Sequence, residues 1–140
     1  PEGLTVDYNV TFNGAGKTIT RDASYTGAII TVKNGATFTG TDRLKAKESD
    51  RGVAMKTELA KMGVSVIVGE NEIEVSKGII TPAQTLSGHN DHRIVMAAAV
   101  AATACREDVT ILGAQAVNKS YPAFWEEYRR LGGNYEQHIR

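Results

Sequence analysis

Apolar and polar residues alternate at the start of the chain, a period typical of β-strands. The alternation runs through residues 4–12, and a turn at residues 13–16 and a short returning strand at 17–20 follow it. A further strand is predicted over residues 28–33, with a turn at 34–35. The amino-terminal part is therefore predicted to be rich in β-structure.

The spacing of apolar residues changes from Lys47 onward. Val53, Met55, Leu59 and Met62 recur at roughly helical intervals, and Gly63 is a residue that commonly ends a helix. The apolar segments at residues 64–68 and 72–75 flank a short polar turn. The pattern predicts a helix followed by a β-hairpin.

A second helix is predicted over residues 91–104, beyond a loop that contains Pro82. Asn90 or Asp91 would cap it, and its apolar residues surround most of its circumference, which predicts burial. A strand at 109–112 and a last helix at 123–131 follow. The order of elements after Lys47 is typical of a two-layer α/β protein with hairpins.

Composition limits the kind of partner that the chain could attract. Its 140 residues correspond to about one domain, and 16 basic residues balance 16 acidic ones. The overall charge therefore favours neither nucleic acid nor a membrane surface. No apolar run is long enough to span a bilayer and no signal peptide is recognised, so we expect a cytoplasmic protein. The single cysteine, Cys105, excludes an internal disulfide and is predicted to lie in the core.

Two charged clusters stand where the predicted helices begin. They are Lys47-Glu48-Ser49-Asp50-Arg51 and Asp91-His92-Arg93. The first N–H groups of a helix lack intrahelical partners and favour negative charge, and an arginine adds a fork suited to carboxylate or phosphate. A nearby Glu or His could move protons. The two clusters together predict a site for a small anionic substrate.

Three motifs together resemble a known family. They are Leu44-Lys45-Ala46-Lys47-Glu48-Ser49-Asp50-Arg51, then Asn90-Asp91-His92-Arg93-Ile94-Val95-Met96-Ala97, then Val117-Asn118-Lys119-Ser120-Tyr121-Pro122-Ala123-Phe124-Trp125. In this order they are similar to the carboxyl end of the 5-enolpyruvylshikimate-3-phosphate synthases. The resemblance implies transfer of the enolpyruvyl group of phosphoenolpyruvate to the 5-hydroxyl of shikimate 3-phosphate, without cofactor or metal, on the shikimate pathway to aromatic amino acids.

The resemblance also implies an architecture. The family has two-layer α/β units of βαβαββ type, arranged in an inside-out, barrel-like α/β domain, with substrates between two such domains. Residues 1–40 would be a divergent β-rich segment, 41–133 the carboxyl-terminal part of one domain, and 134–140 a tail. The missing remainder of the enzyme would be a necessary partner, and no nucleic acid or membrane is implied.

Roles for individual residues follow from the same resemblance. Lys47, Glu48 and His92 would be catalytic, with Glu48 moving a proton at the vinyl carbon. Substrate would be held by residues of both clusters and of the third motif, namely Lys47, Arg51, Asp91, Arg93 and Lys119.

The amino-terminal part departs from the family. A Pro-Asp dipeptide expected before the Lys-Glu motif is missing, and by the resemblance of residues 22–28 to the preceding family segment, Gly27-Ala28 would stand in its place. The long apolar helix expected next would be shortened to residues 29–38, a stretch that the strand prediction partly overlaps. The phosphate-binding residues of the other domain are absent from this chain.

Other interpretations stay open at this point. The charged clusters could be solvated helix starts, and His89, Asp91 and His92 could hold a metal, although no third ligand group stands out. Residues 13–18 resemble a phosphate loop only in part, so a hairpin turn is preferred. Other functions are a related UDP-sugar enolpyruvyl transferase, or a non-catalytic truncated α/β module whose inherited motifs are idle.

Overall fold

The computed structural model describes residues 4–6, 10–13, 30–32, 35–76, 81 and 85–138. The chain divides into two compact units, Pro1–Ile79 and Ile80–Arg140. Both units are mixed α/β. In the described part of the chain, every helix is too short or too polar to cross a bilayer.

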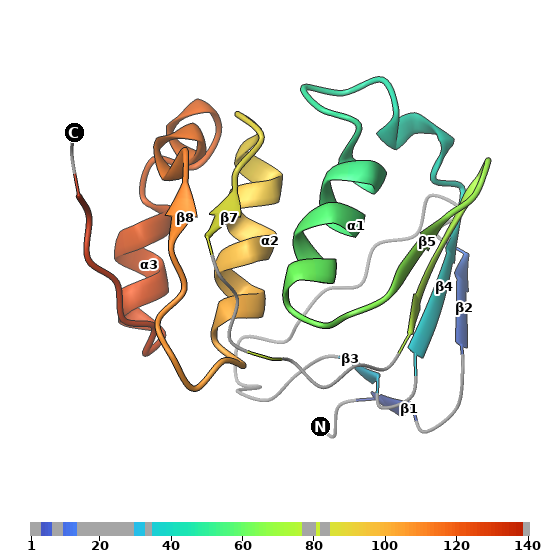
Figure 1. Cartoon of the computed structure of the whole chain (residues 1–140), viewed down its shortest axis with the longest axis horizontal. Coiled ribbons are helices and arrows are strands. Elements are labelled where there is room, and N and C mark those ends of the chain that lie inside the picture. The colour runs from blue at the N-terminus through green and yellow to red at the C-terminus, as the bar shows by residue number, and fades with distance from the viewer. Residues whose placement is uncertain are drawn as a thin grey trace. The chain divides into compact units, whose positions relative to one another are not determined.

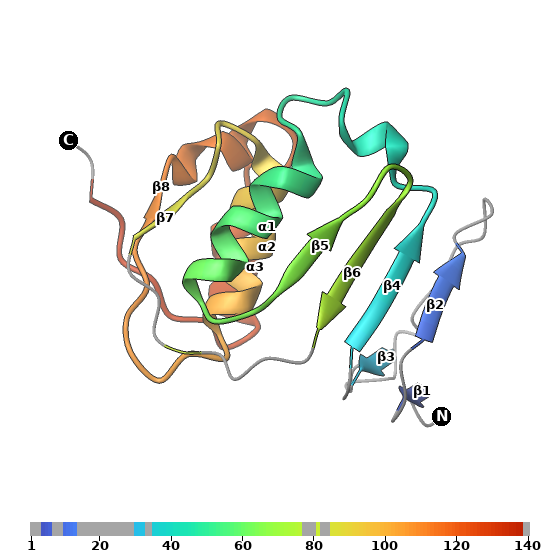
Figure 2. The same cartoon turned by 45° about the vertical axis from the view of Figure 1, so that its right-hand side comes forward.

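The first unit is built on a four-stranded sheet with the order β2-β4-β6-β5. Figure 2 shows these strands side by side, and their bounds are β2 Val10–Asn13, β4 Gly35–Thr39, β5 Val66–Val68 and β6 Glu72–Ser76. β2 runs parallel to β4, whereas β6 is antiparallel to both β4 and β5. A separate parallel pair joins β1 (Leu4–Val6) to β3 (Ile30–Val32).

One face of this sheet packs against helix α1 (Arg51–Lys61). Register places Phe38 opposite Ile73, and Val68 also opposite Ile73, so these three side chains share a face. A Cβ added at Gly52 would lie 3.2 Å from Val68 Cγ1 and 3.3 Å from Ile73 Cδ1, so the first turn of α1 lies directly on that face. A larger residue at position 52 would push the helix entrance away from the sheet.

The predictions for this unit are partly confirmed. The helix, its end near Gly63 (φ 78°) and the 64–75 hairpin are present. The strand predicted over residues 4–12 is instead described as β1 and β2, which belong to different sheets. The helix implied over residues 29–38 is wrong, because β3 and β4 occupy that stretch. The turn and strand predicted over residues 13–20 lie almost wholly outside the described residues.

The second unit is a parallel strand pair with helices. Its strands are β7 (Leu86–Ser87) and β8 (Ile111–Leu112), connected through α2 (His92–Ala102). A 3-10 helix, η2 (Ala114–Lys119), and α3 (Phe124–Arg130) follow, and Figure 1 shows α2 and α3 beside the two strands. The core joins α2, η2 and α3 through the buried residues Val95, Ala99, Ala116, Val117 and Phe124.

The helices of this unit were predicted within one or two residues, but other features were not. β7 and η2 have no counterpart in the prediction. Cys105 is half-buried rather than buried, and its Sγ lies 3.8 Å from the Thr81 carbonyl oxygen. Phe124 is buried, with Trp125 and Tyr128 partly buried against it.

Candidate functional site

The entrance of α1 presents an arginine beside a capping aspartate. Asp50 is the N-cap, and its Oδ1 accepts a hydrogen bond from the Val53 backbone N–H at 3.1 Å. The helix therefore begins at Arg51, and Lys47 and Glu48 precede it as exposed residues rather than forming its first turn. The start predicted at Lys47 was early because a strong aspartate cap competes with helical continuation on its amino-terminal side.

The segment before α1 is tied to the β5–β6 hairpin. Lys45 Nζ donates to the Glu70 carbonyl oxygen at 2.7 Å, and the Asp42 backbone N–H donates to Asn71 Oδ1 at 3.1 Å. The short helix η1 (Asp42–Leu44) lies between these ties. Lys47 and Glu48 thus follow an anchored stretch of backbone, which restricts where their side chains can reach.

Arg51 also lines an apolar pocket of about 440 Å³ within the first unit. The pocket is formed by α1, the sheet and η1, and its apolar lining includes Phe38, Leu44, Met55 and Ile73. Phe38 is 41% exposed although it lies on the sheet face that α1 covers. Arg51 therefore lies where the polar entrance of α1 meets the apolar lining of the pocket.

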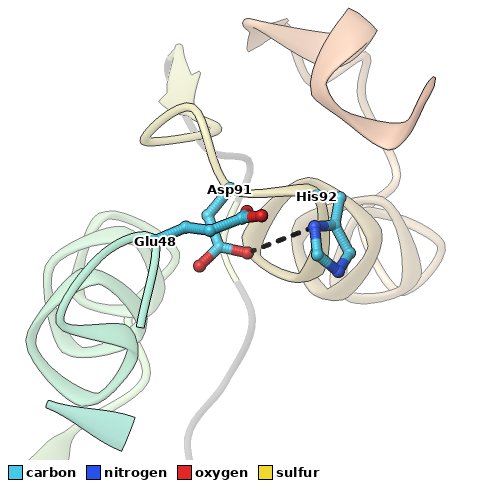
Figure 3. Close-up of side chains that lie close together, drawn as sticks. All are labelled: Glu48, Asp91 and His92. Atoms are coloured by element: carbon cyan, nitrogen blue, oxygen red, sulfur yellow. Dashed lines mark ion pairs between the residues drawn. The ribbon is translucent and has the colours of Figure 1, made fainter. Parts of the chain in front are cut away.

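The entrance of α2 has the same plan. Asp91 is the N-cap, is fully buried, and accepts a hydrogen bond at Oδ1 from the Arg93 backbone N–H at 2.9 Å. Asp91 Oδ1 also lies 3.9 Å from His92 Nδ1, as Figure 3 shows with a dashed line. His92 is buried and Arg93 is exposed, so the cation of this entrance is accessible.

A left-handed turn leads into α2. His89 has φ 49° and Asn90 has φ 53°, values that residues other than glycine rarely adopt. Lys119 Nζ, from the last residue of η2, donates to the Asn90 carbonyl oxygen at 2.6 Å. The structure thus brings Lys119 to the α2 entrance from 29 positions along the chain, beside Asp91, His92 and Arg93.

The predicted site residues fall into two groups, one in each unit. Lys47, Glu48 and Arg51 belong to the first unit, and Asp91, His92, Arg93 and Lys119 belong to the second. The convergence of the two groups stays a prediction. The sequence analysis did not predict the left-handed backbone of the turn before α2. A signal for it was present, because Asn90 follows Gly88 by two residues and Asn tolerates left-handed backbone.

Each entrance combines favourable groups for an anion. The helix dipole at each entrance favours negative charge by about 0.3–1 kcal/mol, and a guanidinium can form two parallel hydrogen bonds to carboxylate or phosphate. Lys119 adds a second cation at α2. The fold is mixed α/β, and both entrances carry the kinds of group with which proteins hold small anions.

Comparison with known proteins identifies the family. The model of the EPSP synthase (3-phosphoshikimate 1-carboxyvinyltransferase) family matches residues 21–128. The 3-phosphoshikimate 1-carboxyvinyltransferase of Clostridium acetobutylicum is 45% identical over 92 residues, covering 66% of this chain and 22% of that protein. The protein of the same name from Methanocella arvoryzae is 44% identical over 95 residues, covering 68% and 22%.

A solved structure agrees with the sequence relatives. EPSP synthase from Acinetobacter baumannii superposes with a TM-score of 0.69 at 31% identity, over 75% of this chain and 25% of that one. The chain therefore belongs to the EPSP synthase family, a family of shikimate-pathway enzymes. It spans only about 22% of the length of the curated relatives that it matches.

Proposed function

We propose that this chain is the carboxyl-terminal part of an EPSP synthase and supplies one side of its active site. Together with the remainder of the enzyme, it would transfer the enolpyruvyl group of phosphoenolpyruvate to the 5-hydroxyl of shikimate 3-phosphate and release phosphate. Residues 41–133 would belong to an inside-out α/β domain, after a divergent segment and before a short tail. One observation supports the proposal most directly. Both α1 and α2 begin with an aspartate N-cap that is followed by an arginine in the first turn.

The charges at these entrances fit the substrates. Phosphoenolpyruvate carries a carboxylate and a phosphate, and shikimate 3-phosphate carries both as well. Arg51 and Arg93 would hold a carboxylate, and Lys119 would face a phosphate. Because these groups are fixed by helix caps and a buried core, they would hold the reactants in register with little reorganisation.

The chemistry also needs a proton donor and acceptor. Protonation of the enol methylene builds positive charge on the carbon that the hydroxyl attacks, which gives a tetrahedral intermediate. Loss of a proton from the resulting methyl group, with departure of phosphate from the tetrahedral carbon, restores the double bond. Glu48 would carry this proton and His92 would assist it, with Lys47 between the two substrates. Asp91 would orient His92, whose Nδ1 lies 3.9 Å from its carboxylate.

A chimera tests this function. Residues 41–133 would replace the matching segment of the Clostridium acetobutylicum relative, and phosphate release from phosphoenolpyruvate would be followed with and without shikimate 3-phosphate. We expect release that depends on shikimate 3-phosphate and falls by about two orders of magnitude in the Arg93→Ala chimera, because misplaced reactants lose that much rate.

Arg106 provides the matched control, since it is an exposed arginine beyond the end of α2. The Arg106→Ala chimera should keep the activity of the unmutated chimera. A chimera that folds, as judged by circular dichroism, yet releases no phosphate would refute the proposed function.

A further inference from the structure

The turn before α2 has a left-handed backbone and is held from several sides. His89 and Asn90 both adopt left-handed backbone, which persists only where the surroundings enforce it. Before the turn, the Gly88 N–H donates to the Leu112 carbonyl oxygen at 2.8 Å, and after it the Asp91 N–H donates to the Gly88 carbonyl oxygen at 2.8 Å. These bonds fix the two ends of the turn.

Gly88 is confined as well as bonded. A Cβ at this position would lie 2.5 Å from Val95 Cγ2 and 2.9 Å from the Leu112 carbonyl oxygen. The His89 N–H donates to Ser87 Oγ at 3.2 Å. The backbone from Ser87 to Gly88 therefore has little freedom, and the direction of the chain is decided by the two residues that follow.

Lys119 acts on the second of those residues. Its ammonium donates to the Asn90 carbonyl oxygen at 2.6 Å, a short bond of the charge-assisted kind. Lys119 ends η2, whose residues Ala116 and Val117 are buried against α2. The ammonium is thus anchored to the same core as the helix whose entrance it contacts.

We propose that Lys119 is a positioning residue for the α2 entrance. By holding the Asn90 carbonyl, it keeps residues 89–90 left-handed and so sets how Asp91, His92 and Arg93 are presented. An ammonium has three N–H donors, of which Asn90 takes one, so the same group can serve a bound anion. This coupling to an anion deepens the proposed function and rests on it, whereas the hold on the turn does not.

The test uses the whole 140-residue chain labelled for NMR. In Lys119→Met we expect the Asn90 carbonyl ¹³C signal to move and the Asp91 amide to exchange with solvent about tenfold faster, because the turn that protects it opens more often. The amides of Ala99 and Val117, in the core, should keep their shifts. Lys119→Arg should restore the Asn90 and Asp91 signals, since a guanidinium can also donate to a carbonyl.

Lys45 offers a matched control. It is an exposed lysine that donates to a carbonyl oxygen, that of Glu70, at 2.7 Å, but in the other unit. Lys45→Met should leave the signals of residues 88–93 unchanged.

In the unmodified chain, the Lys119 ammonium protons should exchange more slowly than those of the exposed Lys56, a measurement that needs no variant to fold.

Phosphoenolpyruvate binding supplies the second readout. We expect Lys119→Met to weaken it by about tenfold and Lys119→Arg by less. Failure of phosphoenolpyruvate to bind the unmodified chain would count against the anion site and against a role of Lys119 in it. The exchange rate of the Asp91 amide would still test whether Lys119 holds the turn in place. Unchanged Asn90 and Asp91 signals in Lys119→Met, or no recovery in Lys119→Arg, would overturn the positioning role.

Discussion

The Asp91 carboxylate accepts a hydrogen bond from the backbone N–H of Arg93 at 2.9 Å, so the cap of α2 and its first accessible cation are joined directly. The same aspartate lies 3.9 Å from the His92 imidazole. The buried Asp91 carboxylate therefore contributes in two ways: it stabilises α2 as its N-cap, and it adds a negative charge to the helix entrance.

Replacing Asp91 separates these roles. Loss of an aspartate cap usually lowers the free energy of unfolding by about 0.5–2 kcal/mol. Because Asp91 is buried, we expect Asp91→Ala to fall in the upper part of this range. Asp91→Asn should keep most of the stability, because asparagine caps as well. It should also bind phosphoenolpyruvate as tightly as the original chain or more tightly, since a negative charge near the anion has gone.

Urea unfolding followed by circular dichroism measures the first effect and an NMR titration the second. The pair Asp50→Ala and Asp50→Asn provides the comparison at α1, where the cap bond to Val53 is similar. Equal stability losses for Asp91→Ala and Asp91→Asn would show that charge, rather than capping, is the main contribution.

An ion pair between a buried carboxylate and an exposed lysine within α1 gives a second prediction. Glu58 is only 2% exposed, and its Oε2 lies 2.7 Å from Lys61 Nζ, one helical turn later. Lys61→Met should destabilise the chain by about 1–3 kcal/mol, because it takes a hydrogen-bonded cation away from a buried carboxylate. The double variant Glu58→Gln with Lys61→Met should recover part of that loss, and urea unfolding measures both.

The control for this prediction is an exposed pair. Glu127 and Arg130 form the same i,i+3 contact at 2.6 Å on α3, but Arg130 is largely exposed. Arg130→Met should cost no more than about 0.5 kcal/mol. An equally small effect for Lys61→Met would mean that burial of Glu58 does not make its partner important.

Tyr128 predicts how stability changes at alkaline pH. Its hydroxyl donates to the Ala99 carbonyl oxygen at 3.2 Å, and burial raises the pKa of Tyr128 above its ordinary value. A raised pKa means that the folded chain favours the protonated phenol. This contribution is complete below the unfolded pKa, about 10, and is lost as pH rises through the higher folded pKa.

Tyr128→Phe should therefore cost about 1 kcal/mol at neutral pH, and the difference from the original chain should shrink above about pH 10. Unfolding free energies across this range, compared with the exposed Tyr121→Phe, measure the effect. A difference that stays constant with pH would contradict the assigned cause.

Sequence alone was sufficient where a local pattern coincided with local chemistry. The run of alanines after Asp91 predicts α2, because a strong cap precedes good helix formers. The 64–75 hairpin was predicted because apolar segments flank a short polar turn, and strands this close in sequence pair readily.

Features that depend on distant partners were not predictable in this way. β7 and β8 each have two residues, too few to show a period, and their pairing depends on α2, the helix that connects them along the chain. β4 pairs with β6, more than 30 residues away, and that pairing overrides the helix implied by the family pattern over residues 29–38. The contact of Lys119 with Asn90 is likewise non-local, so its motif suggested a substrate contact and gave no sign of the turn.

The isolated chain should be inactive in catalysis. It spans about 22% of the length of its curated relatives, so most groups that hold the substrates in a whole enzyme are absent. Losing remote binding groups lowers turnover as well as affinity. We expect no phosphate release from phosphoenolpyruvate that depends on shikimate 3-phosphate, measured with the chimera as positive control. Activity of the purified chain would show that its own residues complete a site.

Weak anion binding by the isolated chain is the last prediction. Arg93 is exposed at the start of α2, with the capped helix entrance and the Lys119 ammonium close by. Water screens each charge, so phosphoenolpyruvate should bind with a Kd on the order of 1 mM, and more weakly as salt rises. Arg93→Ala should remove most of the binding, whereas Arg106→Ala, which changes a cation beyond the helix, should not. Amide shifts during the titration locate the anion: changes near residues 51 and 92 support the entrances, whereas changes confined to residues 13–18 would place the anion elsewhere.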